Sequence, residues 1–402
     1  MKIHSVKLEN FMLFDRLEAE FSPHINLFIG ENSTGKTTLF KALYASARAY
    51  NEAQIAVNKI PDTIDNGKNF PYAQEDVLNL RYQTYWRTIL QSRLAGVFHL
   101  DNMEILNLAN RYNINNTMSL HIGLENNEYF LAQFSESALS PIPIPYLSPR
   151  DYGNTVYIPT GEMISHTENF ASLYEEYHIP FDETCYDLVR LLDRPQKRRL
   201  PEALQAVADT LEKTIGGKVI QKGRVFYLLI DGEEKIEMSL ISEGYRKLAT
   251  LLALLGSGAL SDGSILFWDE PEANMNPKMV KTLVDALLVI ANEGVQVFVS
   301  THDYFVQQYF GLAASYKEKY GEDAGKLDFR FFSLYRETIG DRKTDSADRE
   351  SDRETAKPTG RPTGRVAIES AARLVDLNHN TVNEENDTLY DREVGIIYGN
   401  DA

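Results

Sequence analysis

Cysteine is almost absent from this sequence, since Cys185 is the single one among 402 residues. With one cysteine no internal disulfide can form, which is typical of a protein from a reducing compartment. We expect Cys185 to act as a small, half-buried apolar side chain rather than as a reactive thiol. The composition, 43% hydrophobic and 25% charged, is ordinary for a soluble globular chain.

Long apolar runs are missing as well. The most apolar stretches lie around 248–255 and 283–299, and glycine or acidic residues interrupt them. Neither provides the roughly 20 continuous apolar residues that a membrane-spanning helix needs. The N-terminus also lacks the apolar core of a signal peptide. The sequence therefore predicts a cytoplasmic protein.

Positive charge is scarce, because 41 Lys and Arg face 58 Asp and Glu and leave a net charge of −17. This argues against a surface coated with cations for binding nucleic acid, since phosphate contacts need clustered Lys and Arg. One local cluster does occur in the helical part of the chain: Arg194, Lys197, Arg198 and Arg199. We interpret it as a solvated charged turn, with nucleic-acid binding as the alternative.

The pattern of apolar residues predicts an α/β chain. Residues 1–29 have the pattern of three short strands, and a helix is expected over 37–47. Residues 242–303 follow the order helix, strand, helix, strand of a parallel α/β core. Between these parts we expect mostly helical structure at 51–120, strands at 118–134 and 155–159, two or three helices at 168–215, and a hairpin or small meander at 218–240.

The residues from Gly30 to Thr37, GENSTGKT, fit the pattern GxxxxGK[ST]. They lie between an apolar strand and an apolar-periodic helix, so backbone N–H groups and the positive end of the helix face a phosphate. In such a loop Lys36 reaches the β- and γ-phosphates, and Thr37 places its hydroxyl on Mg²⁺. The predicted ATP contacts are Gly30, Glu31, Asn32, Ser33, Thr34, Gly35, Lys36, Thr37 and Thr38.

Two carboxylates, Asp269 and Glu270, follow the apolar residues 265–268. Ligands of open α/β sheets bind at the carboxyl ends of the strands, which places Asp269 at the metal beside the loop. Glu270 would then orient or polarise the attacking water, and a positioned base contributes on the order of 10²–10⁴ in rate. A further apolar strand ends at His302, for which we expect a γ-phosphate contact. Lys36, Glu270 and His302 are the predicted catalytic residues.

Ser242, Glu243 and Gly244 open a helix that runs through Leu255. Locally, Ser242 is expected to be an N-cap that accepts a hydrogen bond from the first turn. Glu243 would complement the positive end of the helix. This local interpretation is compatible with a functional one.

In their order and spacing, these motifs resemble the ABC-type ATPase head shared by SMC, RecF and OLD proteins. The likeness covers residues 1–45 and roughly 236–310, and it is carried by the segments KIHSVKLENFMLF, NLFIGENSTGKTTLFKAL and WDEPEANMNP. Within this branch the chain is most similar to stand-alone OLD-like ATPases of bacterial anti-phage and toxin–antitoxin-like operons. The resemblance implies a P-loop NTPase with an N-terminal antiparallel β subdomain and a helical insertion. It also implies ATP and Mg²⁺ as cofactors.

The same resemblance implies that two protomers enclose two ATP molecules. Ser242 and Gly244 would contact the γ-phosphate held by the partner's loop, and Asn276 would lie in a loop that crosses the interface. Two departures from the family pattern concern this site. Glu243 stands where the first glycine of the signature is usual, and Ser33 replaces a glycine common in the phosphate loop. A carboxylate at 243 could weaken or tune the contact with the partner.

We divide the chain into five parts on these grounds. They are residues 1–50, the N-terminal half of the head with the P-loop; 51–235, an insertion of mixed strands and helices; 236–335, the C-terminal half of the head; 341–365, a flexible charged linker; and 366–402, a C-terminal strand and helix.

We therefore expect an ATPase that forms a homodimer or higher homo-oligomer and controls a separate effector, a nuclease or toxin, in anti-phage defence. Lys36 and Asp269 are 233 positions apart (269 − 36), which exceeds a compact transporter ATPase, and no long coiled coil makes the chain SMC-like. Residues beyond 310 are too few for a TOPRIM nuclease. The alternatives are a RecF-like DNA repair ATPase, supported by the basic cluster, and a transporter subunit, which Glu243 disfavours.

Overall fold

The computed structural model describes most of the chain. The described residues are 1–58, 74–100, 104–110, 117–125, 129–134, 153–177, 179–230, 234–337 and 365–398. The predicted linker at 341–365 lies, apart from Arg365, outside them.

A six-stranded sheet forms the centre of the molecule, in the order β13-β12-β3-β11-β10-β6. All neighbours in it are parallel except β13, which pairs antiparallel at one edge. Four of its strands, β3, β6, β10 and β11, are buried along their whole length, as is typical of parallel strands covered on both faces. The predicted α/β fold class is confirmed. The strands are β3 (Ile25–Ile29), β6 (Thr155–Ile158), β10 (Ile265–Asp269), β11 (Gln296–Ser300), β12 (Phe329–Arg336) and β13 (Val366–Ala371).

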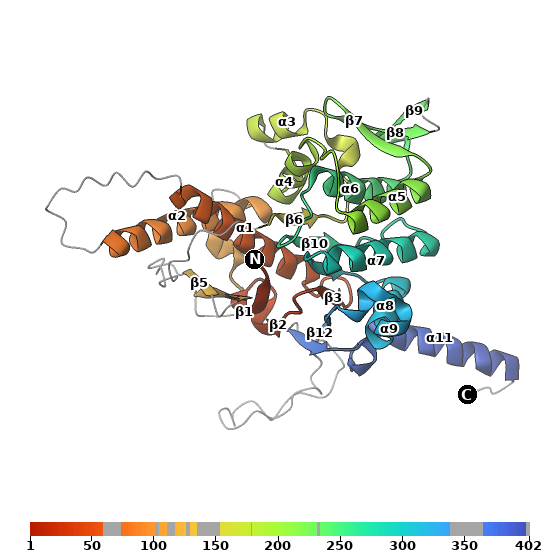
Figure 1. Cartoon of the computed structure of the whole chain (residues 1–402). Coiled ribbons are helices and arrows are strands. Elements are labelled where there is room, and N and C mark those ends of the chain that lie inside the picture. The colour runs from red at the N-terminus through yellow and green to blue at the C-terminus, as the bar shows by residue number, and fades with distance from the viewer. Residues whose placement is uncertain are drawn as a thin grey trace, which may run out of the picture.

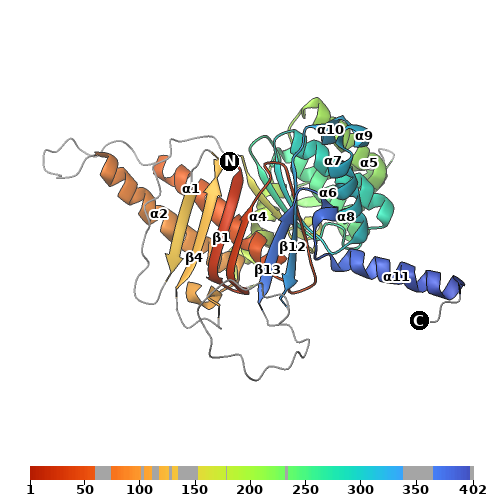
Figure 2. The same cartoon turned by 90° about the horizontal axis from the view of Figure 1, so that it is seen from below.

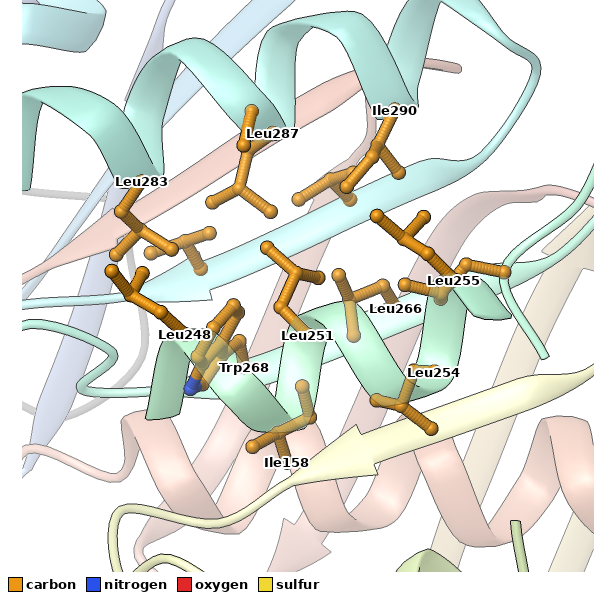
Figure 3. Packing of buried hydrophobic residues seen from close by; sticks show 14 of the residues in the cluster. Ile158, Leu248, Leu251, Leu254, Leu255, Leu266, Trp268, Leu283, Leu287 and Ile290 are labelled. Atoms are coloured by element: carbon orange, nitrogen blue, oxygen red, sulfur yellow. The ribbon is translucent and has the colours of Figure 1, made fainter. Parts of the chain in front are cut away.

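The two faces of this sheet carry different side chains. Aromatic rings gather on the face covered by α1 (Lys36–Asn58), where Phe28 stacks on Phe332 with ring centroids 4.3 Å apart. On the other face, leucines of α6 (Glu243–Ser257) and α7 (Pro277–Asn292) pack on the apolar side chains of β10, as Figure 3 shows. Figure 1 shows the sheet between these helices. The alternation of side chains along each strand thus builds two separate cores.

A second sheet is antiparallel and has the order β2-β1-β4-β5. Together with α1 and α2 (Gln74–Val97) it encloses the aromatic-rich core, and Figure 2 shows β1 and β4 beside these helices. The predicted N-terminal antiparallel β subdomain is confirmed, although half of its strands come from residues beyond 117. Its strands are β1 (Ile3–Phe11), β2 (Phe14–Glu20), β4 (Met118–Leu124) and β5 (Tyr129–Phe134).

A helical layer and a small sheet fill the region between β6 and α6. The helices are α3 (Phe170–Glu176), α4 (Glu183–Leu192) and α5 (Glu202–Ile215), which agrees with the predicted two or three. The strands β7 (Lys218–Lys222), β8 (Val225–Ile230) and β9 (Glu234–Glu237) pair antiparallel in sequence order. The predicted meander at 218–240 is therefore confirmed.

The remaining elements are helices of the C-terminal part and 3-10 turns spread along the described chain. They are α8 (Tyr304–Ser315), α9 (Lys317–Tyr320), α10 (Glu322–Gly325), α11 (Thr381–Tyr398) and 3-10 turns at Ile105–Leu108, Ile164–His166, Met238–Leu240 and Leu374–Asp376. Helix α11 extends away from the rest of the molecule (Figure 2). The predicted helix at 37–47 is α1, which begins at Lys36 and continues to Asn58. It is longer than predicted, and Glu52 in its second half pairs with Arg93 of α2.

Candidate active site

The GENSTGKT segment forms the turn between β3 and α1. Gly30 and Gly35 have φ angles of +139° and +96°, and a Cβ atom on Gly30 would lie 2.2 Å from the main-chain oxygen of Leu334. Only glycine fits such an approach. Ser33 also has a positive φ, +62°, so the serine that replaces a glycine holds the left-handed conformation at a cost.

The ammonium group of Lys36 lies over this turn. It donates to the main-chain oxygens of Gly30 at 2.6 Å and Glu31 at 2.9 Å, and the residue is only 5% exposed. Burial lowers the pKa of Lys36, while the nearby carboxylates of Glu270 and Asp269 act in the opposite direction. The ammonium group is therefore held by the main-chain oxygens of the turn and lies near the carboxylates of Glu270 and Asp269.

Six of the nine predicted ATP contacts are at least partly exposed. Glu31, Asn32, Ser33 and Thr37 are exposed, Gly30 and Thr38 are half-buried, and Thr34, Gly35 and Lys36 are buried.

Asp269 ends β10 directly beside the start of α1. The hydroxyl of Thr37 donates to Asp269 Oδ2 at 2.6 Å, and the hydroxyl of Ser300 donates to Asp269 Oδ1. Burial raises the pKa of Tyr157 well above its usual value, so this phenol stays protonated and donates to Oδ2 at 3.4 Å. Asp269 is thus a buried carboxylate, and hydroxyl groups from α1, β11 and β6 fix its orientation.

Glu270 follows in a strained main-chain conformation. Its φ is +48°, which is uncommon for a residue with a side chain. The N–H of Glu270 donates to the main-chain oxygen of Ser300 at 3.1 Å and lies 3.2 Å from its hydroxyl oxygen. Its carboxylate lies 3.1 Å from His302 Nδ1, so the structure brings two predicted catalytic residues into contact. Strain of this kind is often found where a side chain must be aimed at a substrate.

Glu272 is a residue that the sequence analysis did not single out. It is buried, and it accepts a hydrogen bond of 2.6 Å from the hydroxyl of Thr301. Burial raises the pKa of Glu272, and the bond from Thr301 acts in the opposite direction. The contact joins the turn after β10 to the segment after β11. The segment EPEA contains Glu272, but only tertiary structure reveals its partner.

The start of α6 departs from the expected capping pattern. Ser242 occupies the N-cap position, yet its side chain accepts no hydrogen bond from the first turn, so the prediction of a capping hydroxyl was wrong. The main-chain oxygen of Ser242 accepts the first main-chain hydrogen bond of the helix, from Arg246 N. Glu243 accepts from Asn274 Nδ2 at 2.8 Å, and a Cβ on Gly244 would lie 2.8 Å from the oxygen of Asn274. Packing on the turn after β10, rather than a side-chain cap, fixes this helix start.

Asn276 and Ser242 are both exposed. Asn276 is the N-cap of α7, and its Oδ1 accepts from Met279 N at 3.1 Å. Among the residues that the structure describes, no hydrogen bond joins Ser242 to the phosphate loop of its own chain. Roles for both residues at an interface stay predictions.

The paired oxygens of Thr37 and Asp269 fit a Mg²⁺ ion. This cation takes oxygen ligands and usually needs only one or two from the protein, since water and phosphate oxygens complete the shell. No cluster of three or more His, Cys, Asp or Glu side chains suited to a metal occurs among the described residues. The donor set therefore suits an ion that arrives with phosphates.

The predicted basic cluster lies in the loop between α4 and α5. Arg194, Lys197, Arg198 and Arg199 are exposed, and the N–H of Lys197 donates to the main-chain oxygen of Gly256 at 2.7 Å. This hydrogen bond attaches the loop to the C-terminal end of α6. Binding of nucleic acid here stays a prediction.

Two family descriptions match different parts of the chain. Residues 125–306 match one described as "AAA domain, putative AbiEii toxin, Type IV TA system", and residues 1–70 match one described as "AAA ATPase domain". The two ranges contain the phosphate loop, Asp269, Glu270 and His302. A segment of 49 residues is 47% identical to the DNA replication and repair protein RecF of Lysinibacillus sphaericus. These matches support an ABC-type ATPase head.

The relatives match only parts of this chain. The match to Lysinibacillus sphaericus RecF spans 12% of this chain and 13% of that protein. RecF of Staphylococcus haemolyticus is 28% identical over 118 residues, which are 28% of this chain and 30% of that protein. The OLD-like subtype is not among these findings and stays a prediction.

Two solved structures resemble this chain at low sequence identity. The SMC head domain from Thermotoga maritima is 14% identical, with a TM-score of 0.42, and the match covers 92% of this chain and 99% of that one. An Smc head domain bound to the C-terminal domain of ScpA, derived from Pyrococcus furiosus, is 10% identical, with a TM-score of 0.44, and covers 98% and 99%. In the part of the chain that the structure describes, no helix has the length and apolar character for crossing a membrane.

Proposed function

We propose that this chain binds ATP with Mg²⁺ and hydrolyses it at the edge where β3, β10 and β11 end. The observation that carries the proposal is the 2.6 Å hydrogen bond from Thr37 to Asp269, which joins the phosphate loop to the strand-end carboxylate. Glu270 and His302 stand next to that pair. Such an arrangement would supply a phosphate cradle, a metal site and a base within one edge of the sheet.

Each residue has a chemical role in this proposal. Lys36 and the loop N–H groups would bind the phosphates, and Thr37 with Asp269 would hold the Mg²⁺, which would neutralise charge on the phosphate oxygens. The Glu270 carboxylate accepts a hydrogen bond from the attacking water and orients it. His302, whose Nδ1 lies 3.1 Å from the Glu270 carboxylate, would donate to the γ-phosphate.

We further propose that the site is completed by a second copy of the chain. Ser242 is exposed and Asn276 is exposed at the start of α7, so both are accessible to a partner. Ser242 and Gly244 would contact the γ-phosphate held by the partner's loop. Glu243, held by Asn274, would face the partner without pointing at the phosphate.

The enzyme would act on a separate effector, a nuclease or toxin, in anti-phage defence. Support comes from the complete candidate ATP site and from the family description that names a toxin system. The alternative is a RecF-like DNA repair ATPase, supported by the RecF matches and by the exposed basic cluster.

Phosphate release and molecular mass test the enzymatic part. The purified chain should release phosphate from ATP only with Mg²⁺, and Glu270→Gln should lower kcat on the order of 10²–10⁴ while it still binds ATP. Glu270→Gln should also form a dimer with ATP in light scattering. Glu318→Gln is the matched control, because it makes the same replacement at an exposed position on α9. It should hydrolyse ATP at the rate of the unchanged protein. Absence of Mg²⁺-dependent phosphate release from the natural chain would refute the proposal.

Two further measurements separate effector control from DNA repair. Glu270→Gln should retain a nuclease or toxin from its host in a pull-down that Lys36→Ala does not. DNA binding that falls steeply with salt and is lost in Arg198→Glu/Arg199→Glu would instead favour the RecF-like alternative.

A further inference from the structure

Lys247 is a buried cation that the proposed chemistry does not use. It is 1% exposed and lies in the second turn of α6, five positions after Ser242. Burying an ammonium group is costly unless it is paired, and an apolar side chain would fill the same space without that cost. The position therefore needs a reason beyond packing.

The ammonium of Lys247 donates to the main-chain oxygen of Glu270 at 3.1 Å. Ala273 N donates to the same oxygen at 3.2 Å, and the N–H of Glu270 is held by Ser300. The left-handed main chain of Glu270 is thus fixed from both sides. Lys247 is the member of this set that comes from α6.

Two more contacts join the start of α6 to the same turn. Glu243 accepts from Asn274 Nδ2 at 2.8 Å, and Gly244 approaches the oxygen of Asn274 so closely that a Cβ there would lie at 2.8 Å. Asn274 has a φ of +64°, so this turn contains two left-handed residues with side chains. The first turns of α6 and residues 270–274 are therefore packed as one unit.

We propose that Lys247 is a positioning residue that couples the two half-sites within one chain. It ties Glu270, which would act on the chain's own ATP, to the helix start that presents Ser242 to the partner's ATP. A displacement of α6 on dimer formation is passed to the Glu270 main chain through this hydrogen bond. The inference rests on the proposed function and adds to it how hydrolysis is made dependent on the second copy.

Substitutions at position 247 separate the hydrogen bond from packing. Lys247→Met keeps the length of the side chain and removes the donor, whereas Lys247→Gln keeps a donor without the charge. We expect kcat to fall about tenfold in Lys247→Met and less in Lys247→Gln, with the KM for ATP within about twofold in both, since one misplaced catalytic group affects kcat. Lys281→Met on α7, whose side chain is 56% exposed, is the matched control.

The coupling itself has a separate readout. Phosphate release measured against ATP concentration should be cooperative in the natural chain and lose its cooperativity in Lys247→Met, while light scattering still shows the ATP-dependent dimer. If Lys247→Met does not fold, Asn274→Gly serves in its place, because it removes the bond to Glu243 and tolerates the left-handed conformation. We expect about a threefold loss of kcat and weaker cooperativity from it.

The outcomes distinguish this inference from the proposed function. A natural chain that does not hydrolyse ATP refutes the proposed function itself. A natural chain that does, together with a folded Lys247→Met of unchanged kcat and cooperativity, overturns only the role of Lys247. A loss that scales with a lower melting temperature and disappears at lower assay temperature also overturns it, because a purely structural role would behave in that way.

Discussion

The hydroxyl of Thr37 donates to the carboxylate of Asp269 across 2.6 Å, although 232 positions separate the two residues. The contact exists because β10 is separated from β3 in the sheet by a single strand, β11. It places an N-terminal helix start and a strand end from the middle of the chain at one point. The proposed metal site depends on this pairing.

Asp269→Asn should therefore remove the proposed metal site with little change of shape. We expect Mg²⁺-dependent ATP hydrolysis to fall on the order of 10² or more, because the charge that holds the ion is lost. Binding of a fluorescent ATP analogue in EDTA should persist, since the phosphate loop is intact. Asp262→Asn, an exposed position before β10, is the control. Full activity of Asp269→Asn would contradict the assignment.

Ser33→Gly should stabilise the protein. Ser33 has a φ of +62°, a conformation that costs a residue with a side chain about 1–2 kcal/mol relative to glycine. The hydrogen bond from Arg336 to Ser33 uses the main-chain oxygen and survives the change. We expect a rise in melting temperature of about 2 °C by differential scanning calorimetry. A lower melting temperature would show that the hydroxyl stabilises the loop.

Gly244→Ala should displace the start of α6. The added Cβ would lie 2.8 Å from the oxygen of Asn274, and overpacking of this kind costs about 1–3 kcal/mol. We expect a lower free energy of unfolding in urea and at least a tenfold weaker ATP-dependent dimer by light scattering. Gly161→Ala is the control, because a Cβ there would meet no atom within 4 Å. Equal behaviour of the two variants would contradict the argument.

Cys185 should be chemically inert in the folded protein. It is 8% exposed, and burial raises the pKa of the Cys185 thiol to about 12. Because the thiolate is the reactive form, iodoacetamide at pH 8 should modify the unfolded chain far faster than the folded one. Mass spectrometry after timed labelling with and without urea measures this, and equal rates would contradict it.

The same thiol links stability to alkaline pH. Its pKa in the folded state lies above the ordinary value of 9.0, so the unfolded chain loses this proton first as the pH rises. The contribution to stability is complete below about pH 9 and is lost between pH 9 and about 12. Urea titrations at pH 8 and 10 should show a larger fall in the natural chain than in Cys185→Ala.

Local patterns predicted the elements that carry the candidate site. The phosphate loop was predictable because its eight residues are contiguous and lie between a buried strand and a helix. The strand before Asp269 and the one before His302 were predictable from their apolar runs. The capping hydroxyl of Ser242 was not, because a contact with the neighbouring turn replaced it.

Contacts between distant segments could not be predicted from the sequence. Glu272 bonds to Thr301, and Lys247 bonds to Glu270, across 29 and 23 positions. Strand β6 comes from a region that had the pattern of an insertion, yet it pairs with β10 in the central sheet. In each case the residues around the position have the same local pattern whether or not its contact partner lies nearby in the fold.

The sequence by itself determined that a phosphate loop is present, that acidic and histidine residues end two buried strands, and that the chain is α/β. Those features depend on neighbours within a few residues, where propensity and periodicity act. The tertiary structure alone decided that Thr37 meets Asp269 and that Lys247 holds Glu270. Strand order and helix packing bring such pairs together, and they follow from the burial of the whole chain rather than from any local segment.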